Sequence, residues 1–301
     1  MELSTALLIF LLIFVLIFVL RMPIPMGMMT ACVFYFLVSG ESPKMVAQQT
    51  LKTFYTNYTI IAVPLFIFAA NVMNSGKVTE KVFGFAMGFV GRFKGGLGHV
   101  NVLASLVFSG MTGSAIADAS GLGKMEIDAM RQEGYDDGFS CAITAASATI
   151  GPIFPPSIPM VIYSMLSGAS VGALFMGGMM PGILLALALM VYIFFIAHKR
   201  NYPISEKVNL RAFLRYTFNA IPAILTPVIL LVGIYTGVMT PTEAGAVAGL
   251  YALIVAVFGY RVLKWDGFKQ VLIDTVKATG TTSIMIGAAT TISYIVAKEQ
   301  V

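Results

Sequence analysis

Long runs of apolar residues, separated by short polar loops, dominate this chain of 301 residues. Crossing the hydrocarbon core of a bilayer takes about 20 apolar residues in a helix, and most of the runs approach that length. The pattern predicts spanning segments at residues 3–20, 22–39, 58–74, 137–167, 171–198, 218–236, 240–260 and, with weaker hydropathy, 275–297. We therefore expect an all-α polytopic membrane protein.

One further apolar stretch, residues 97–121, is rich in Gly, Ser and Thr and has its polar residues in the middle. If it enters and leaves on the same side, and if the N-terminus is outside, most Lys and Arg residues fall in cytoplasmic loops. A simple crossing would place the very basic loop 198–215 outside, against the positive-inside rule. The charge pattern thus predicts a re-entrant hairpin and a periplasmic N-terminus.

Three amphipathic stretches, residues 77–93, 124–135 and 206–216, lie in the loops of this topology. Each has the composition of a helix at the inner membrane interface, although a solvated linker explains 124–135 equally well. The first apolar run lacks a preceding positive residue and a following cleavage site, so we interpret it as a retained helix.

Composition excludes several classes of protein. Hydrophobic residues make up 58% of the chain and charged residues only 11%, against about 25% charged residues in soluble domains. The net charge of +5 follows from basic loops, so we expect no nucleic-acid partner. His99 and His198 are unpaired, and no phosphate-binding loop motif occurs, so neither an enzyme nor an ATP-driven pump is expected. Cys32 and Cys141 are interpreted as small buried residues.

The chain contains a faint inverted repeat. Residues 22–27 and 240–245 are Pro- and Gly-containing openings of apolar helices that run in opposite directions in the predicted topology, a transporter architecture. We predict one membrane domain with a first repeat at about 1–170, a linking helix and arm at 171–217, and the start of a second repeat at 218–301. The second copy stops where its own hairpin should begin, which predicts a fragment of a longer protein.

Two stretches carry the candidate chemistry. In residues 109–123, Gly110 and Gly113 permit a tight turn, and backbone of that kind is tolerated at membrane depth only in protein or beside a cavity. In residues 144–159, four prolines remove backbone donors, so that segment 137–167 should be two half-helices with an unwound middle. Exposed carbonyls suit a hard cation, and half-helix N-termini suit an anion.

From these stretches we select candidate ligands. The candidates for a cation such as Na⁺ are Ser109, Gly110, Gly113, Ser114, Asp118, Ser147 and Gly151. The candidates near the substrate are Thr112, Pro155, Pro156 and Ser157. The alternative for each serine is a structural role in helix packing. Asp118 could also cap a half-helix, and Glu243, in Thr-Pro-Thr-Glu, is interpreted as a helix cap.

The sequences Gly-Met-Thr-Gly-Ser-Ala-Ile-Ala-Asp-Ala-Ser-Gly-Leu-Gly at 110–123 and Gly-Pro-Ile-Phe-Pro-Pro-Ser-Ile-Pro-Met-Val-Ile-Tyr at 151–163 closely resemble the large membrane subunit, of DctM type, of tripartite ATP-independent periplasmic (TRAP) transporters. Residues 179–182 and 240–246 resemble it too. The resemblance implies an elevator-type, Na⁺-driven importer of C4-dicarboxylates or sialic acids in the bacterial inner membrane, with the first Na⁺ site between the hairpin and the broken helix. It also implies a small membrane subunit, a periplasmic substrate-binding protein, and a second hairpin that this chain lacks.

Neither broken element contains Arg or Lys, so the carboxylate of an acid substrate would be held by backbone N–H groups and hydroxyls, or by residues beyond Val301. A related ion-coupled anion transporter or channel that works without a binding protein is the alternative function. No cofactor is expected apart from the coupling ion.

Overall fold

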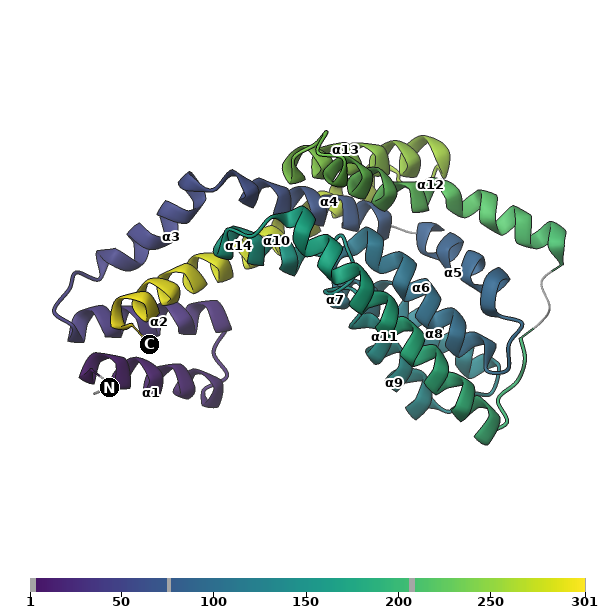
Figure 1. Cartoon of the computed structure of the whole chain (residues 1–301), viewed down its shortest axis with the longest axis horizontal. Helices are drawn as coiled ribbons and strands as arrows, with labels where there is room; N and C mark the ends of the chain where they lie inside the picture. The colour runs from purple at the N-terminus through teal and green to yellow at the C-terminus, as the bar shows by residue number, and fades with distance from the viewer. Residues whose placement is uncertain (1–3, 75–76, 206–208, 301) are drawn as a thin grey trace. The chain divides into compact units, whose positions relative to one another are not determined.

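The computed structural model describes residues 4–74, 77–205 and 209–300, and its regular structure in these ranges is helical (Figure 1). The chain divides into two compact units, which we describe separately. The smaller unit comprises residues 1–60 and 276–301, and the larger unit comprises residues 61–275.

Within the described ranges, four helices are long and apolar enough to cross a membrane: Val171–Lys199, Arg211–Tyr235, Pro241–Gly259 and Trp265–Glu299. A fifth is obtained if Lys44–Thr56 and Tyr58–Asn74 count as one broken span, and shorter apolar helices lie at Thr5–Ile17, Ile24–Val38 and Ile158–Ser167. These lengths confirm an all-helical, multi-pass membrane protein. They support fewer full-length spans than the apolar runs predict.

The smaller unit consists of α1 (Thr5–Val19), α2 (Ile24–Val38), α3 (Lys44–Thr56) and the second part of α14 (Trp265–Glu299). Its core includes Phe10, Tyr35 and Ile295, all buried. The Tyr35 hydroxyl donates to Glu299, which ties α2 to the end of α14. Burial of these apolar side chains supplies the main driving force for packing.

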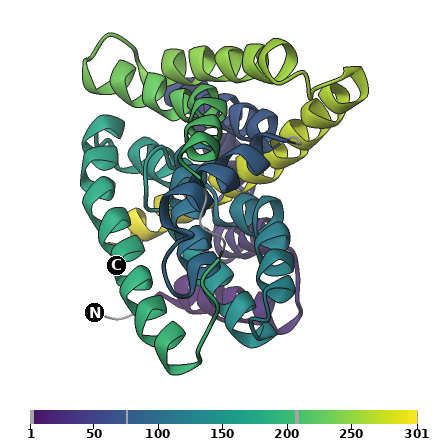
Figure 2. The ribbon, with the colours of Figure 1, turned by 90° about the vertical axis from the view of Figure 1, so that its right-hand side faces the viewer.

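The larger unit is built around α6 (Gly96–Thr112), whose side chains are almost all buried. It packs against α4 (Ala62–Asn74), α5 (Lys77–Val90), α9 (Asp137–Ala148) and α11 (Val171–Lys199). Figure 2 shows α11 running along the flank of this bundle. Two further helices, α12 (Leu210–Tyr235) and α13 (Pro241–Ile254), pack on each other, on α5 and on α4. A π-helical turn, Val255–Gly259, follows α13.

Helix boundaries match the predicted segments with four differences. Helix α12 begins at Leu210. The sequence predicted a separate interface helix at 206–216, but residues 210–216 form the first two turns of α12. Residues 206–208 lie outside the described ranges. Helix α14 starts about ten residues before the predicted span, at Trp265. Helix α3 was not predicted, and residues 58–61 form a 3-10 turn. The cap at Glu243 is confirmed, because it forms a capping box with Thr240.

The two cysteines differ in exposure. Cys32 is buried in the core of the smaller unit, as expected. The expectation is wrong for Cys141, which is exposed on α9. Its neighbours Ser140 and Ile143 are buried, so Cys141 lies on the outward side of that helix.

Candidate functional site

The hairpin predicted at residues 97–121 is present as a helical turn-back. Helix α6 ends at Thr112, and Gly113 adopts a left-handed conformation with a φ of 59°, which glycine adopts with least strain. The chain then returns as α7 (Ala115–Gly121) and α8 (Gly123–Gln132). Antiparallel alignment follows from the hydrogen bond between Asn101 of α6 and Glu126 of α8.

The broken helix is also present. Helix α9 stops at Ala148, and α10 (Ile158–Ser167) starts ten residues later. Between them lies a tight loop that contains a cis peptide bond at Pro155–Pro156. Ser157 caps α10, since its hydroxyl oxygen accepts from the Met160 amide. The same hydroxyl donates to the Pro152 carbonyl at 2.6 Å, which closes the loop.

The hairpin tip and this proline loop are in direct contact. The Ile158 amide donates to the Gly113 carbonyl at 3.4 Å. A Cβ atom at Gly113 would lie 2.5 Å from the Pro156 carbonyl oxygen, and one at Gly151 would lie 2.9 Å from the Ser114 carbonyl carbon. Both glycines therefore allow an approach of backbone to backbone that no other residue would permit. The two interrupted stretches meet, as the sequence predicts.

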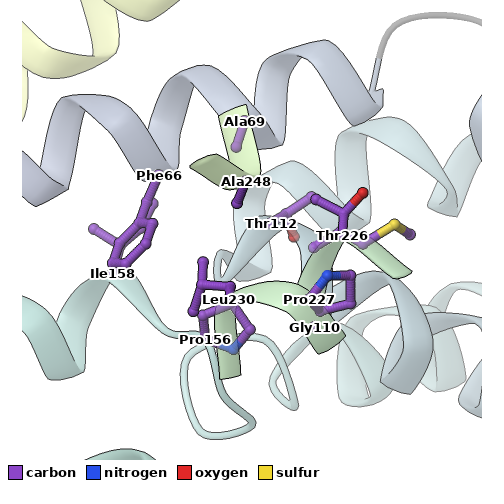
Figure 3. Close-up of a pocket in the computed structure, with 11 residues that line it drawn as sticks. Phe66, Ala69, Gly110, Thr112, Pro156, Ile158, Thr226, Pro227, Leu230 and Ala248 are labelled. Carbon is purple, nitrogen blue, oxygen red and sulfur yellow. The ribbon is translucent and has the colours of Figure 1, made fainter. Parts of the chain in front are cut away.

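A small pocket lies where the tip and the loop face α4, α12 and α13 (Figure 3). Its lining is mostly apolar and includes Pro227, Leu230 and Ala248. The polar groups in it are Thr112 and Thr226, whose hydroxyls donate to the Phe108 carbonyl and the Met73 sulfur. Of the substrate candidates, Thr112 and Pro156 line this pocket. The Ser157 hydroxyl is engaged in the loop and the helix cap.

A polar stripe runs along α6 below the tip. Asn101, Ser105 and Ser109 recur at intervals of four residues and so share one face of the helix. All three are buried. Facing them on α9 are Thr144 and Ser147, also buried. The four-residue spacing in an otherwise apolar helix is the signal from which Asn101 and Ser105 could have been selected as site residues, although neither was predicted from the sequence.

Asn101 is the hub of this polar region. Its Nδ2 donates to Glu126 Oε2 at 2.8 Å and to Thr144 Oγ1 at 2.7 Å, while its Oδ1 accepts from the Ser147 hydroxyl at 2.6 Å. The Ser105 hydroxyl donates to the Ser147 oxygen at 3.2 Å, and the Ser147 hydroxyl also lies 3.1 Å from the Thr144 carbonyl oxygen. Glu126, which the sequence placed at an interface or in a linker, is thus fully buried in the larger unit.

Several buried oxygens near the tip lack hydrogen bonds of standard geometry within the described part of the chain. They are the Ser109 hydroxyl and both carboxylate oxygens of Asp118, although the Ser105 hydroxyl lies near that carboxylate. Buried polar atoms almost always have a hydrogen-bond partner. Buried oxygens that lack such a partner within the chain are therefore available to a bound ligand. The Ser114 hydroxyl instead caps α7, accepting from the Ala117 amide.

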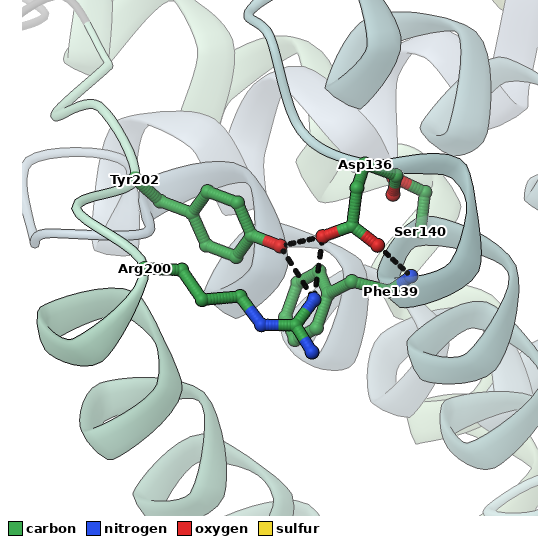
Figure 4. A network of polar contacts seen from close by, with 5 residues as sticks. All are labelled: Asp136, Phe139, Ser140, Arg200 and Tyr202. Atoms are coloured by element: carbon green, nitrogen blue, oxygen red, sulfur yellow. Dashed lines mark hydrogen bonds and ion pairs between the residues drawn. The ribbon is translucent and has the colours of Figure 1, made fainter.

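A second polar network joins the start of α9 to the end of α11 (Figure 4). Asp136 caps α9 by accepting from the Phe139 amide at 2.8 Å. Its other oxygen accepts from Tyr202 and forms an ion pair with Arg200 at 2.6 Å. These contacts, led by the Tyr202 hydroxyl, lower the pKa of Asp136 to about 2. The network lies away from the hairpin tip and holds the first half of the broken helix in place.

A family model decides the identity of the chain. The model for the DctM component of tripartite ATP-independent periplasmic transporters matches residues 10–301. The chain belongs to this family. As a DctM-family chain it is part of a transporter permease and not an enzyme, as the sequence predicts.

Curated DctM-family relatives cover most of the chain. It is 45% identical to the sialic acid TRAP transporter large permease protein SiaM of Vibrio cholerae, over 90% of the chain and 63% of that protein. It is 40% identical to the sialic acid TRAP transporter permease protein SiaT of Haemophilus influenzae, over 93% of the chain and 45% of that protein. Identity to the C4-dicarboxylate TRAP transporter large permease protein DctM of Pseudomonas aeruginosa is 37%, over 86% of the chain and 61% of that protein. The chain thus spans less than two thirds of these relatives.

Proposed function

We propose that this chain supplies the first cation site of a Na⁺-coupled importer of organic acids. The observation that carries the proposal is the contact between the Gly113 tip and the Gly151 loop. Backbone that leaves a helix frees carbonyl oxygens, which are suitable ligands for a hard cation. No ATP-binding motif occurs in the sequence, so an ion gradient is the energy source that fits.

The cation would lie between the tip and the loop, among Ser109, Gly110, Gly113, Ser114, Asp118, Ser147 and Gly151. The unpartnered oxygens of Ser109 and Asp118 support this assignment. Ser114 and Gly151 would contribute through backbone atoms, since the Ser114 hydroxyl already caps α7.

The substrate would lie on the apolar side of the same junction, near Thr112, Pro155, Pro156 and Ser157. None of the described residues that line this pocket is Lys or Arg, so backbone N–H groups and hydroxyls would hold a carboxylate. The relatives named for sialic acid are 45% and 40% identical to the chain, and the Pseudomonas aeruginosa relative named for C4-dicarboxylates is 37% identical. We propose a sialic acid type of substrate first and a C4-dicarboxylate second.

Family membership supports the rest of the proposed system, and the pattern of basic loops supports its orientation. A small membrane subunit and a periplasmic binding protein would complete the importer, in the bacterial inner membrane and with the N-terminus of this chain in the periplasm. The inverted repeat and an elevator movement of the larger unit belong to the same proposal.

Ion binding tests the proposal directly, because both broken elements lie within the chain. The purified chain is heated in detergent with NaCl or with choline chloride at equal ionic strength. We expect a higher melting temperature in Na⁺ than in choline, because a ligand that binds the folded state stabilises it. Equal melting temperatures in the two salts would refute the cation site. Uptake of sialic acid by the complete system should likewise stop when choline replaces Na⁺.

A further inference from the structure

The buried hub on α6 has a hydrogen-bond direction that can be derived residue by residue. The C=O oxygen of a carboxyl group only accepts hydrogen bonds, whereas a hydroxyl both donates and accepts. Glu126 is the member of the hub that carries a carboxylate bonded to Asn101. It therefore decides which end of the Asn101 amide faces it, and that end is the NH₂ group.

The orientation of the Asn101 amide determines the direction of its hydrogen bond with Ser147. With its NH₂ group directed at Glu126 and Thr144, Asn101 presents its carbonyl oxygen to the Ser147 hydroxyl. The Ser147 hydroxyl then donates to Asn101 Oδ1 at 2.6 Å, and the Thr144 carbonyl is a second acceptor at 3.1 Å. The Ser147 oxygen accepts from the Ser105 hydroxyl at 3.2 Å, which leaves one lone pair free. A reversed amide would donate to Ser147 and occupy this remaining lone pair, while the Ser147 hydroxyl turned to the Thr144 carbonyl.

We propose that Glu126, acting through Asn101, is a positioning residue that holds Ser147 as a hydrogen-bond acceptor and so keeps its oxygen available to a cation. The inference rests on the proposed function, in which Ser147 is a cation ligand. Groups that orient a ligand commonly change metal affinity by about 10- to 100-fold when they are removed.

The proposal distinguishes two substitutions at one position. Glu126→Gln retains a carbonyl oxygen that can accept from Asn101, and its NH₂ group can replace the unpartnered Oε1. Glu126→Leu removes the acceptor and leaves the amide free to turn. We expect the Na⁺ concentration for half-maximal thermal stabilisation to rise about tenfold in Glu126→Leu and to stay within about twofold of the original in Glu126→Gln.

Exchanging the amide and the carboxyl group between positions 101 and 126 should restore Na⁺ affinity. In Asn101→Asp two carboxylates face each other, and we expect weaker Na⁺ binding. In Asn101→Asp combined with Glu126→Gln, the new amide on α8 can donate to the new carboxylate on α6, whose second oxygen still accepts from Ser147. Na⁺ affinity should then return toward that of the original chain, which a loss of packing alone would not produce.

Asp128→Asn is the matched control, because Asp128 lies on the same helix, α8, and its side chain is half exposed. Its Na⁺ response should be unchanged. Melting temperatures in choline report folding separately for each variant. Unchanged Na⁺ affinity in Glu126→Leu, or a double variant no better than Asn101→Asp, would overturn the positioning role. Absence of any Na⁺ effect in the original chain would instead refute the proposed function, and with it the basis of this inference.

Discussion

The contact between the hairpin tip and the proline loop can be tested with one added methyl group. In Gly151→Ala the new Cβ would lie 2.9 Å from the Ser114 carbonyl carbon, 3.0 Å from the Ala115 nitrogen and 3.2 Å from the Ser114 oxygen. All three are backbone atoms, so no side chain can turn aside to relieve the clash. Overpacking of this kind typically costs about 1–3 kcal/mol.

Gly177→Ala is the control for Gly151→Ala. Gly177 lies in α11, and apart from its chain neighbours and the backbone of its own helix no described atom is found within 4 Å of its Cβ position. Alanine favours a helix over glycine by about 0.5–1 kcal/mol, so this variant should be as stable as the original chain or more so. The two substitutions add the same atoms and should change stability in opposite directions.

Thermal melting followed by circular dichroism in detergent measures both variants. For a unit of this size, about 1 kcal/mol corresponds to roughly 2–4 °C, so Gly151→Ala should melt about 2–12 °C below the original chain. Its stabilisation by Na⁺ should also fall, because the tip and the loop are held apart. A Gly151→Ala variant that melts as high as Gly177→Ala would refute the close approach on which the cation site depends.

Three further predictions concern the polar contacts. Asn101→Leu leaves three buried polar groups without their partner and should lower the free energy of unfolding by about 2 kcal/mol or more, measured by thermal melting. Ser157→Ala removes the cap of α10 and the bond across the proline loop and should cost about 1–2 kcal/mol, whereas Ser167→Ala, at an exposed helix position, should be close to neutral in the same assay. Asp136→Asn should lower the melting temperature by a constant amount from about pH 8 to 5, because a carboxylate with a lowered pKa stabilises the fold at every pH above its ordinary value. The difference should shrink only as the pH falls from about 4 toward 2, and a gap that closes near neutral pH would contradict the assigned contacts with Arg200.

Local backbone chemistry explains why the breaks could be predicted. Pro152, Pro155 and Pro156 cannot donate backbone hydrogen bonds, and Gly113 tolerates a positive φ, whatever surrounds them. These constraints act within a few residues and so can be read from the sequence. The turn at the tip and the gap between α9 and α10 were located correctly for this reason.

The hub around Asn101 depends on tertiary packing and was missed. Glu126 lies between Lys124 and Asp128 in the sequence, a pattern that is typical of a solvated helix. Only the packing of α8 on α6 and α9 buries it. Cys141 illustrates the same limit in the opposite direction, since an apolar neighbourhood in the sequence did not place it in a core. Whether a helix residue is exposed depends on which face of the helix packs against other elements. Residues that are distant in the sequence determine that face.

The difference between the two cysteines makes the unaltered chain suitable for fluorescence spectroscopy. A maleimide dye should attach to the exposed Cys141 and leave the buried Cys32 unmodified while the protein is folded. The sequence contains a single tryptophan, Trp265, which is exposed at the start of α14 and belongs to the same unit as the dye. Energy transfer from this indole to a dye on α9 would therefore report ligand-induced displacement of the first half-helix without any engineered labelling position.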